Sequence, residues 1–170
     1  DQLALNWQRL IFTHLLERSH PGVLTGSPLT DVKITLTAGR AHLKHTEGGD
    51  FREATYRAIR NALMQAENVL LEPVVRFELA FHQDMLSKVT GELIRLGAEI
   101  DAPEYDGEEV RLGGTCTASA FWDYPQRFAA TTRGNGRISS RFEKYAPCRN
   151  QDEIVREIGY SALADVKNPP

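Results

Sequence analysis

The sequence contains few cysteines, no long apolar run and no strong net charge, and each absence excludes a class of protein. Cys116 and Cys148 are the only cysteines in 170 residues, too few for the disulfide framework of a small secreted domain, so we expect reduced thiols. No stretch approaches the roughly 20 apolar residues that cross a bilayer. The first residues lack the basic start of a signal peptide. We therefore expect a cytoplasmic protein with no membrane partner.

The charge is small overall but unevenly distributed. A formal net charge of −3 gives no global attraction to nucleic acid, so any RNA contact must come from a local patch. Residues 98–109 carry six acids and no base. Between residues 126 and 149 the charged side chains are six bases and one acid: Arg127, Arg133, Arg137, Arg141, Lys144, Arg149 and Glu143. A solvated face is the simpler interpretation, and an RNA-facing edge is the alternative.

Hydrophobic periodicity predicts two helices and one strand in the first 70 residues. An amphipathic helix is expected over residues 3–19, and a half-buried strand over 31–36. Asp50 is a plausible N-cap for the second helix, with Glu53 closing a capping box. A lone strand cannot form a stable sheet. Either a second strand runs through residues 40–44, or partner strands lie upstream; we favour the second explanation, which, like the missing initial Met, indicates a fragment of a longer chain.

The remainder of the chain alternates strands and helices in a defined order. Strand, helix, hairpin, helix and strand patterns follow one another over residues 70–147, which gives β-α-β-β-α-β, the ferredoxin-like arrangement. The fold class is therefore α+β. Cys116, Trp7 and Trp122 are expected to pack in the interior, and the last 20 or so residues contain a helical turn or two.

The stretch "RAHLKHTEGGDF" is the first candidate site. His42 and His45 form H-x-x-H, but no third ligand for zinc stands nearby, and nothing supplies a nucleophile or oxyanion hole. We therefore predict neither a metal site nor a catalytic residue. Two interpretations remain: solvated histidines in a polar loop, or an RNA contact in which bases and histidines meet phosphates and bases while the Gly-Gly pair lets the backbone approach. The candidate residues are Arg40, His42, Lys44, His45, Thr46, Glu47, Gly48 and Gly49.

The stretch "TTRGNGR" is the second candidate site. It is not a P-loop, because it lacks G-x-x-x-x-G-K-[ST] and precedes a strand rather than a helix. A tight turn with Gly134 and Gly136 at positive φ is one interpretation, and a contact surface is the other. The candidate residues are Arg133, Gly134, Asn135, Gly136 and Arg137.

Three stretches together carry a family resemblance: "GVLTGSPLTDVKITLTAGRAHLKHTEGGDFREATYRAI", "VLLEPVVRFEL" and "TRGNGRISSRFEKYAPC". They resemble the C-terminal part of the translational GTPases, namely elongation factor G and, more closely, the tetracycline-resistance ribosomal protection proteins. The resemblance extends from about residue 3 to residue 160. It implies that residues 1–70 are the C-terminal half of domain IV without its first strands. Residues 71–147 would be the ferredoxin-like domain V, and residues 148–170 a helical tail.

This resemblance also implies a function. The family places the tip of domain IV in the ribosomal A site, where residues 40–49 would contact small-subunit rRNA, and His42 falls where elongation factor G has a tip histidine. The loop at residues 133–137 would contact the GTPase-associated region of the large subunit. The tip departs from the Pro- and Ser-containing tip of the protection proteins, so drug resistance is not implied.

No cofactor is expected in this chain. GTP and Mg would bind in an upstream part of the parent, which the resemblance implies is a GTPase. The alternative is a stand-alone RNA-binding module of ferredoxin-like fold. Sheet edges left exposed by the missing strands would allow the fragment to self-associate.

Overall fold

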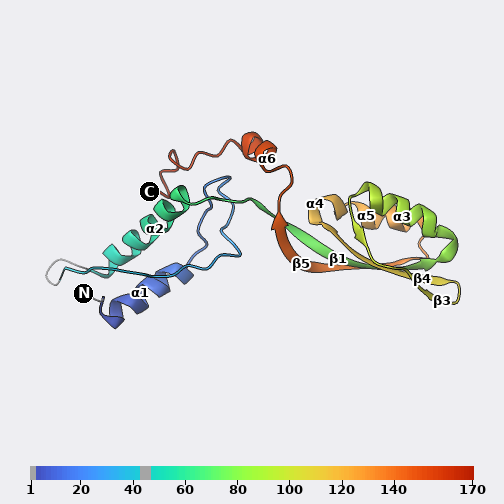
Figure 1. The fold of residues 1–170 in the computed structure, drawn as a ribbon, viewed down its shortest axis with the longest axis horizontal. Coiled ribbons are helices and arrows are strands. Elements are labelled where there is room, and N and C mark those ends of the chain that lie inside the picture. The colour runs from blue at the N-terminus through green and yellow to red at the C-terminus, as the bar shows by residue number, and fades with distance from the viewer. Residues whose placement is uncertain (1–2, 43–46) are drawn as a thin grey trace. The chain divides into compact units, whose positions relative to one another are not determined.

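The computed structural model describes residues 3–42 and 47–170, and the chain divides into two units (Figure 1). The helical unit comprises Asp1–Leu70 together with Arg149–Pro170, and the sheet unit comprises Leu71–Cys148. The C-terminal residues therefore pack with the first part of the chain rather than forming a separate tail.

Two helices that pack against each other, α1 and α2, form the centre of the helical unit. Its helices are α1 (Leu5–Leu16), α2 (Gly48–Gln65) and α6 (Gln151–Ile158). The α1–α2 contact is aromatic: Trp7 stacks on Phe51 with ring centroids 4.6 Å apart and planes at 19°. Phe51 and Ile59 of α2 are buried. The expected packing role of Trp7 is confirmed.

The strand expected at residues 31–36 is not formed. Neither this stretch nor residues 40–42 is assigned to a strand, and the described part of the helical unit contains only a single bridge, between Pro21 and Pro28. Val32 and Ile34, which should have lined a buried face, are 53% and 41% exposed. The physical reason is that a strand needs a hydrogen-bonding neighbour, and residues 3–42 and 47–70 supply none.

Helix α2 begins earlier than the sequence predicts. Its N-cap is Glu47 rather than Asp50, and the capping box joins these two residues: the Glu47 N–H donates to Asp50 Oδ2 at 2.8 Å. Glu53, expected to close the box, instead accepts from Arg57 at 2.9 Å. Both carboxylate pairs have the three-residue spacing of a capping box, and the earlier pair prevails. Gly48 and Gly49 therefore lie in the first helical turn and not in a loop.

The sheet unit has the predicted ferredoxin-like topology. Its strands are β1 (Leu71–His82), β2 (Glu99–Ile100), β3 (Glu104–Asp106), β4 (Glu109–Thr117) and β5 (Arg137–Pro147). Its helices are α3 (Leu86–Arg95), α4 (Ala118–Phe121) and α5 (Tyr124–Thr131), with a 3₁₀ turn at Gln83–Met85. The antiparallel sheet has the order β2-β4-β1-β5, and β3 also pairs with β4, so β2 and β3 are one interrupted edge strand.

The core lies between the sheet and its helices. Its buried residues alternate along β1 and β4 and recur on the inner faces of the helices: Phe77, Leu79, Phe81, Val89, Leu93, Val110, Leu112, Cys116, Phe121, Tyr124 and Phe128. The expected burial of Cys116 is thus confirmed. That of Trp122 is wrong, since this side chain is 83% exposed. Its neighbour Phe121 takes the core position and stacks on Phe77, with centroids 5.2 Å apart.

No helix in the described ranges 3–42 and 47–170 is long and apolar enough to cross a membrane.

Candidate nucleic-acid interface

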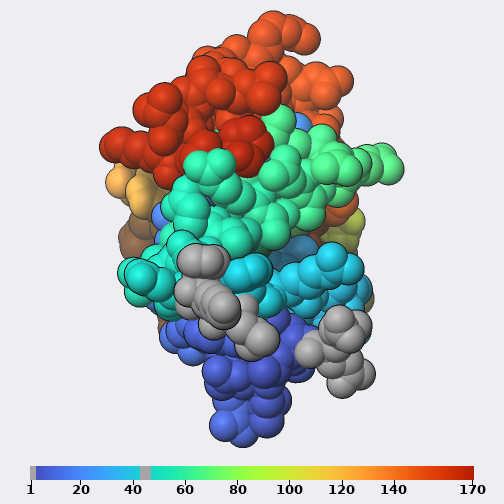
Figure 2. All heavy atoms as spheres, turned by 90° about the vertical axis from the view of Figure 1, so that its left-hand side faces the viewer, coloured from blue at the N-terminus to red at the C-terminus, as the bar shows by residue number. Residues whose placement is uncertain are grey.

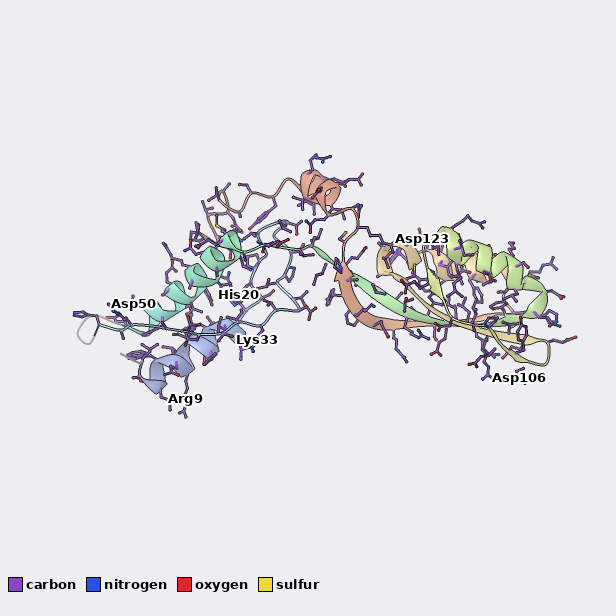
Figure 3. All side chains as sticks on the ribbon, viewed as in Figure 1. Arg9, His20, Lys33, Asp50, Asp106 and Asp123 are labelled. Carbon is purple, nitrogen blue, oxygen red and sulfur yellow. The ribbon has the colours of Figure 1, made fainter. Side chains whose placement is uncertain are left out.

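The structure divides the first set of candidate residues into three groups. Arg40 and His42 are exposed and lie on the segment that precedes α2. Lys44, His45 and Thr46 lie outside the described residues. Glu47, Gly48 and Gly49 form the N-cap and first turn of α2, all exposed. Figure 3 shows Asp50 at this start of α2, and Figure 2 shows α1 (blue) and α2 (teal) on the same face of the helical unit.

The glycine pair leaves the backbone of the first turn uncovered. A Cβ atom at Gly49 would meet nothing within 4 Å, and one at Gly48 would only reach Leu10 Cδ2 at 3.9 Å. Neither glycine has a positive φ. Neither packing nor backbone conformation therefore requires glycine here, and a partner could approach this backbone closely.

Two carboxylates already occupy the positive end of this helix. The Glu47 side chain accepts the N–H of Asp50, and the Asp50 side chain accepts the N–H of Glu47. An incoming phosphate would have to displace them from the helix N-terminus. Positive charge for an RNA contact must therefore come from the segment before the helix, where Arg40 lies.

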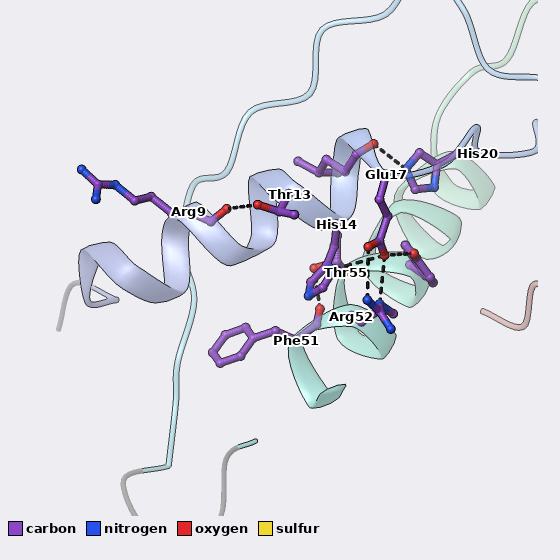
Figure 4. Close-up of polar contacts among 10 residues, drawn as sticks. Arg9, Thr13, His14, Glu17, His20, Phe51, Arg52 and Thr55 are labelled. Atoms are coloured by element: carbon purple, nitrogen blue, oxygen red, sulfur yellow. Dashed lines mark hydrogen bonds and ion pairs between the residues drawn. The ribbon is translucent and has the colours of Figure 1, made fainter. Parts of the chain in front are cut away.

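A polar network joins the C-terminal end of α1 to the first turns of α2 (Figure 4). Glu17 is its centre. It accepts from the Tyr56 hydroxyl, from Arg52 Nε at 3.0 Å and Nη2 at 3.3 Å, and from His14 Nδ1 at 3.1 Å. The hydrogen bond from Tyr56, followed by those from His14 and Arg52, lowers the pKa of Glu17 from 4.5 to about 2. The start of α2 is thus held against α1 by several hydrogen bonds that one ionised carboxylate accepts.

The C-terminal segment is fastened to the same pair of helices by Arg60 of α2. Arg60 Nη2 donates to the Tyr160 hydroxyl at 2.6 Å and to the Ala162 carbonyl at 2.9 Å, and Nη1 donates to the Pro21 carbonyl at 3.3 Å. Its side chain is 3% exposed and lies 3.8 Å from Asp165. The hydrogen bond from Tyr160, then that from Asn168, lowers the pKa of Asp165 from 3.8 to about 2.

Sequence reasoning missed this Arg60 cluster, which consists of Arg60, Tyr160, Ala162 and Asp165. The available signal was an arginine directly after Ile59 on the apolar face of a predicted helix. Such a position suggests a buried cation that needs acceptors, but it does not say where the acceptors lie.

The second candidate set forms one turn between α5 and β5. Arg133 and Gly134 have φ values of 53° and 78°, and the N–H of Gly134 donates to the Ala129 carbonyl at 2.8 Å. The positive φ expected at Gly134 is confirmed, but Gly136 does not have one. Gly136 is required by packing, because a Cβ there would lie 2.6 Å from the Phe128 ring. Arg133, Gly134 and Asn135 are exposed together at the turn.

Arg137, unlike the other residues of the turn, is paired with an acid on another strand. Its Nη2 donates to both carboxylate oxygens of Glu109 at 2.8 Å across the sheet. The available positive charge of the turn is therefore mainly that of Arg133.

The open face of the sheet carries a groove of about 680 Å³. Charged, small and apolar residues line it together; of the charged ones, Arg76 pairs with Asp101, and Arg111 lies 3.6 Å from Asp106. Because these charges are paired within the chain, the groove has no strong preference for an anion. In the part of the chain that is described, no three His, Cys, Asp or Glu side chains converge as metal ligands would.

Comparisons with known proteins agree with this arrangement. Residues 2–67 match the family model for elongation factor G, domain IV, and residues 69–154 match that for the elongation factor G C-terminus. The tetracycline resistance protein TetP of Clostridium perfringens is 33% identical over 84% of this chain and 22% of its own length. Elongation factor G 1 of Synechocystis is 30% identical over 80% of this chain and 20% of its own length.

A solved structure agrees at the level of the fold. A crystal structure of a protein from Thermus thermophilus matches 92% of this chain and 24% of its own, with a TM-score of 0.86 at 23% identity. The chain spans about a fifth of the length of the two relatives. The two matched family models are those of domain IV and of the C-terminus of elongation factor G. Since the two models together account for residues 2–67 and 69–154, the chain belongs to the elongation factor G family, of which it holds domain IV and C-terminal sequence.

Proposed function

We propose that this chain is the ribosome-binding C-terminal part of a cytoplasmic translation factor. The observation that carries the proposal is the exposure of Arg40 and His42 on the segment that precedes α2, a helix that the Glu17 network holds against α1. Fixed geometry suits recognition of folded rRNA, since little conformational entropy is lost on binding.

The tip residues have separate roles in this proposal. Arg40 and Lys44 supply charge to small-subunit rRNA, and His42 and His45 supply stacking surfaces. Thr46, Glu47 and the glycine pair shape the approach to α2.

The sheet unit makes the second contact. The turn from Arg133 to Arg137 faces large-subunit rRNA, and Arg133 provides its positive charge. GTP and Mg bind outside this chain, in the remaining four-fifths of a full-length protein of the size of the relatives.

Co-sedimentation of the full-length protein with ribosomes tests the tip assignment. The double substitution His42→Ala with His45→Ala should weaken ribosome binding, because it removes the two proposed stacking surfaces for rRNA bases. Lys33→Ala is the matched control, since Lys33 is an exposed base on the same segment. Unchanged co-sedimentation of the double variant with ribosomes would refute the assignment.

A further inference from the structure

Among the strands of the fully described sheet unit, β5 forms an edge, with β1 on its inner side and no strand paired on its outer side. The sheet order places β5 beside β1 only, and all residues of the sheet unit are described. Nine of its 11 residues are exposed. An edge of this length presents a row of unpaired backbone N–H and C=O groups, which is where an extended peptide can add as a further strand.

A β-bulge in β5 determines which face of the sheet each side chain of this edge points to. Val75 lies opposite Phe142 and Val74 opposite Lys144, so Glu143 is the extra residue in β5. In a regular strand, residues three apart point to opposite faces. Here Phe142 and Tyr145 contact each other, with ring centroids 5.0 Å apart, because the bulge returns them to one face.

The same bulge aligns the bases on the other face. Arg141 pairs in register with Arg76 and Lys144 with Val74, and Arg76 and Val74 share a face of β1 because they are two residues apart. The edge of β5 is therefore basic on the open face of the sheet and aromatic on the face that carries the helices. Phe142 and Tyr145 are 56% and 42% exposed.

Within the part of the chain that is described, Arg141 and Lys144 are the unpaired positive charges of this edge. Directly across from Arg141 stands Arg76, whose charge is already neutralised by Asp101. Neither Arg141 nor Lys144 has an ion-pair partner among the residues that the structure describes. Two like charges opposite each other in a sheet destabilise it unless an acid stands beside them. A strand added at this edge would bring its side chains within cross-strand distance of Arg141 and Lys144.

We propose that β5 binds an acidic, extended protein segment by strand addition, a segment in which acidic and apolar residues alternate. Its acids lie against Arg141 and Lys144 on the open face, and its apolar side chains lie against Phe142 and Tyr145 on the other. A second copy of β5 fits poorly, because its own bases would face these bases. This partner is a protein and is distinct from the rRNA contacts proposed above.

The test uses the whole chain and the blocked peptide Glu-Val-Glu-Val-Glu-Val-Glu, with binding followed by fluorescence anisotropy and β5 protection by amide hydrogen exchange. The peptide should bind and should slow exchange at β5. Replacing both bases (Arg141→Glu with Lys144→Glu) should weaken binding by about tenfold or more. The same variant should gain affinity for a peptide with Lys in place of each Glu.

Two controls separate strand addition from general charge attraction. The variant Lys88→Glu with Arg95→Glu makes the same charge change at exposed positions of α3 and should bind the acidic peptide normally. A peptide N-methylated at alternate amides keeps its charges but cannot pair along one edge, and it should not bind.

Four results would overturn the proposal: equal binding of the methylated peptide, equal loss in the α3 variant, protection of β5 by a uridine decamer but not by the peptide, or protection of β5 in a dimer of the chain without peptide. The third would make the edge an RNA surface, and the fourth a self-association site.

Discussion

Replacing Arg60 by methionine should release the C-terminal segment from the helical unit. Arg60 is 3% exposed, and its guanidinium makes two short hydrogen bonds, to Tyr160 and Ala162, and a longer one to Pro21. Hydrogen bonds from charged groups contribute about 1.5–3 kcal/mol each. Methionine fills most of the volume but leaves Asp165 without its cation. We expect the free energy of unfolding of the helical unit to fall by about 3 kcal/mol.

The two tryptophans make this loss measurable. Trp7 stacks on Phe51 in the helical unit, and Trp122 is exposed in the sheet unit, so in a Trp122→Phe background the fluorescence of Trp7 reports the helical unit alone. Urea titrations of the Trp122→Phe protein with and without Arg60→Met give the difference in the free energy of unfolding of the helical unit.

Arg57→Met is the matched control for that experiment. Arg57 lies on the same helix, is 52% exposed and pairs with Glu53 four residues earlier. Such a surface pair contributes about 0.5 kcal/mol or less. If Arg60→Met costs no more than Arg57→Met, the Arg60 cluster does not hold the segment in place, and the reasoning is wrong.

Three further outcomes are expected. Gly136→Ala should destabilise the sheet unit by about 1–3 kcal/mol in urea titration, because its Cβ would overlap the Phe128 ring; an unchanged midpoint would show that this contact relaxes freely. Because the folded-state pKa of Glu17 is depressed from 4.5 to about 2, its stabilisation should be present above pH 4.5 and lost as the pH falls through about 2. The Trp7-reported urea midpoint should follow that course, and Glu17→Gln should reduce the fall but not abolish it, because Asp165 of the same unit also has a lowered pKa. Trp122→Ala should leave thermal stability nearly unchanged, whereas Phe121→Ala should cost about 3–5 kcal/mol; equal effects would place Trp122 in the core.

The sheet unit was predictable because its strands all lie within one continuous stretch of sequence. Alternation along β1 and β4 and helical periodicity in α3 each reflect burial against neighbours that the same stretch supplies. Period and order were therefore sufficient to give β-α-β-β-α-β. The exposure of Trp122 was not predictable, since Phe121 and Trp122 are adjacent and residue type alone does not decide which of them points inward.

The helical unit was harder to predict because its contacts are distant or ambiguous. Alternation at residues 31–36 indicated a buried face, but burial requires a partner strand that the described residues do not provide. Glu47 with Asp50 and Asp50 with Glu53 fit a capping box equally well in the sequence. Arg60 finds its acceptors 100 and 102 residues away, a pairing that no local pattern encodes.

The candidate site was predicted in part. The exposure of Arg40 and His42 could be predicted from the polar residues around them and the Gly-Gly pair that follows. The pairing of Arg137 with Glu109 could not, because it joins residues of two different strands that are 28 positions apart in the sequence.

The pairing of β1 with β5 has a consequence for how the chain closes on itself. Leu71 lies opposite Pro147, and the Leu70 N–H donates to Gln151 Oε1 at 2.6 Å, so the chain leaves the helical unit and re-enters it at neighbouring points. Joining the ends of a flexible loop of roughly 80 residues costs about 4 kcal/mol. A folded sheet unit removes that cost, because its own first and last strands hold the two ends one strand spacing apart. The folded sheet unit thus keeps the two parts of the discontinuous helical unit close together. We therefore expect the sheet unit to fold before the segment that carries Tyr160 and Asp165 docks.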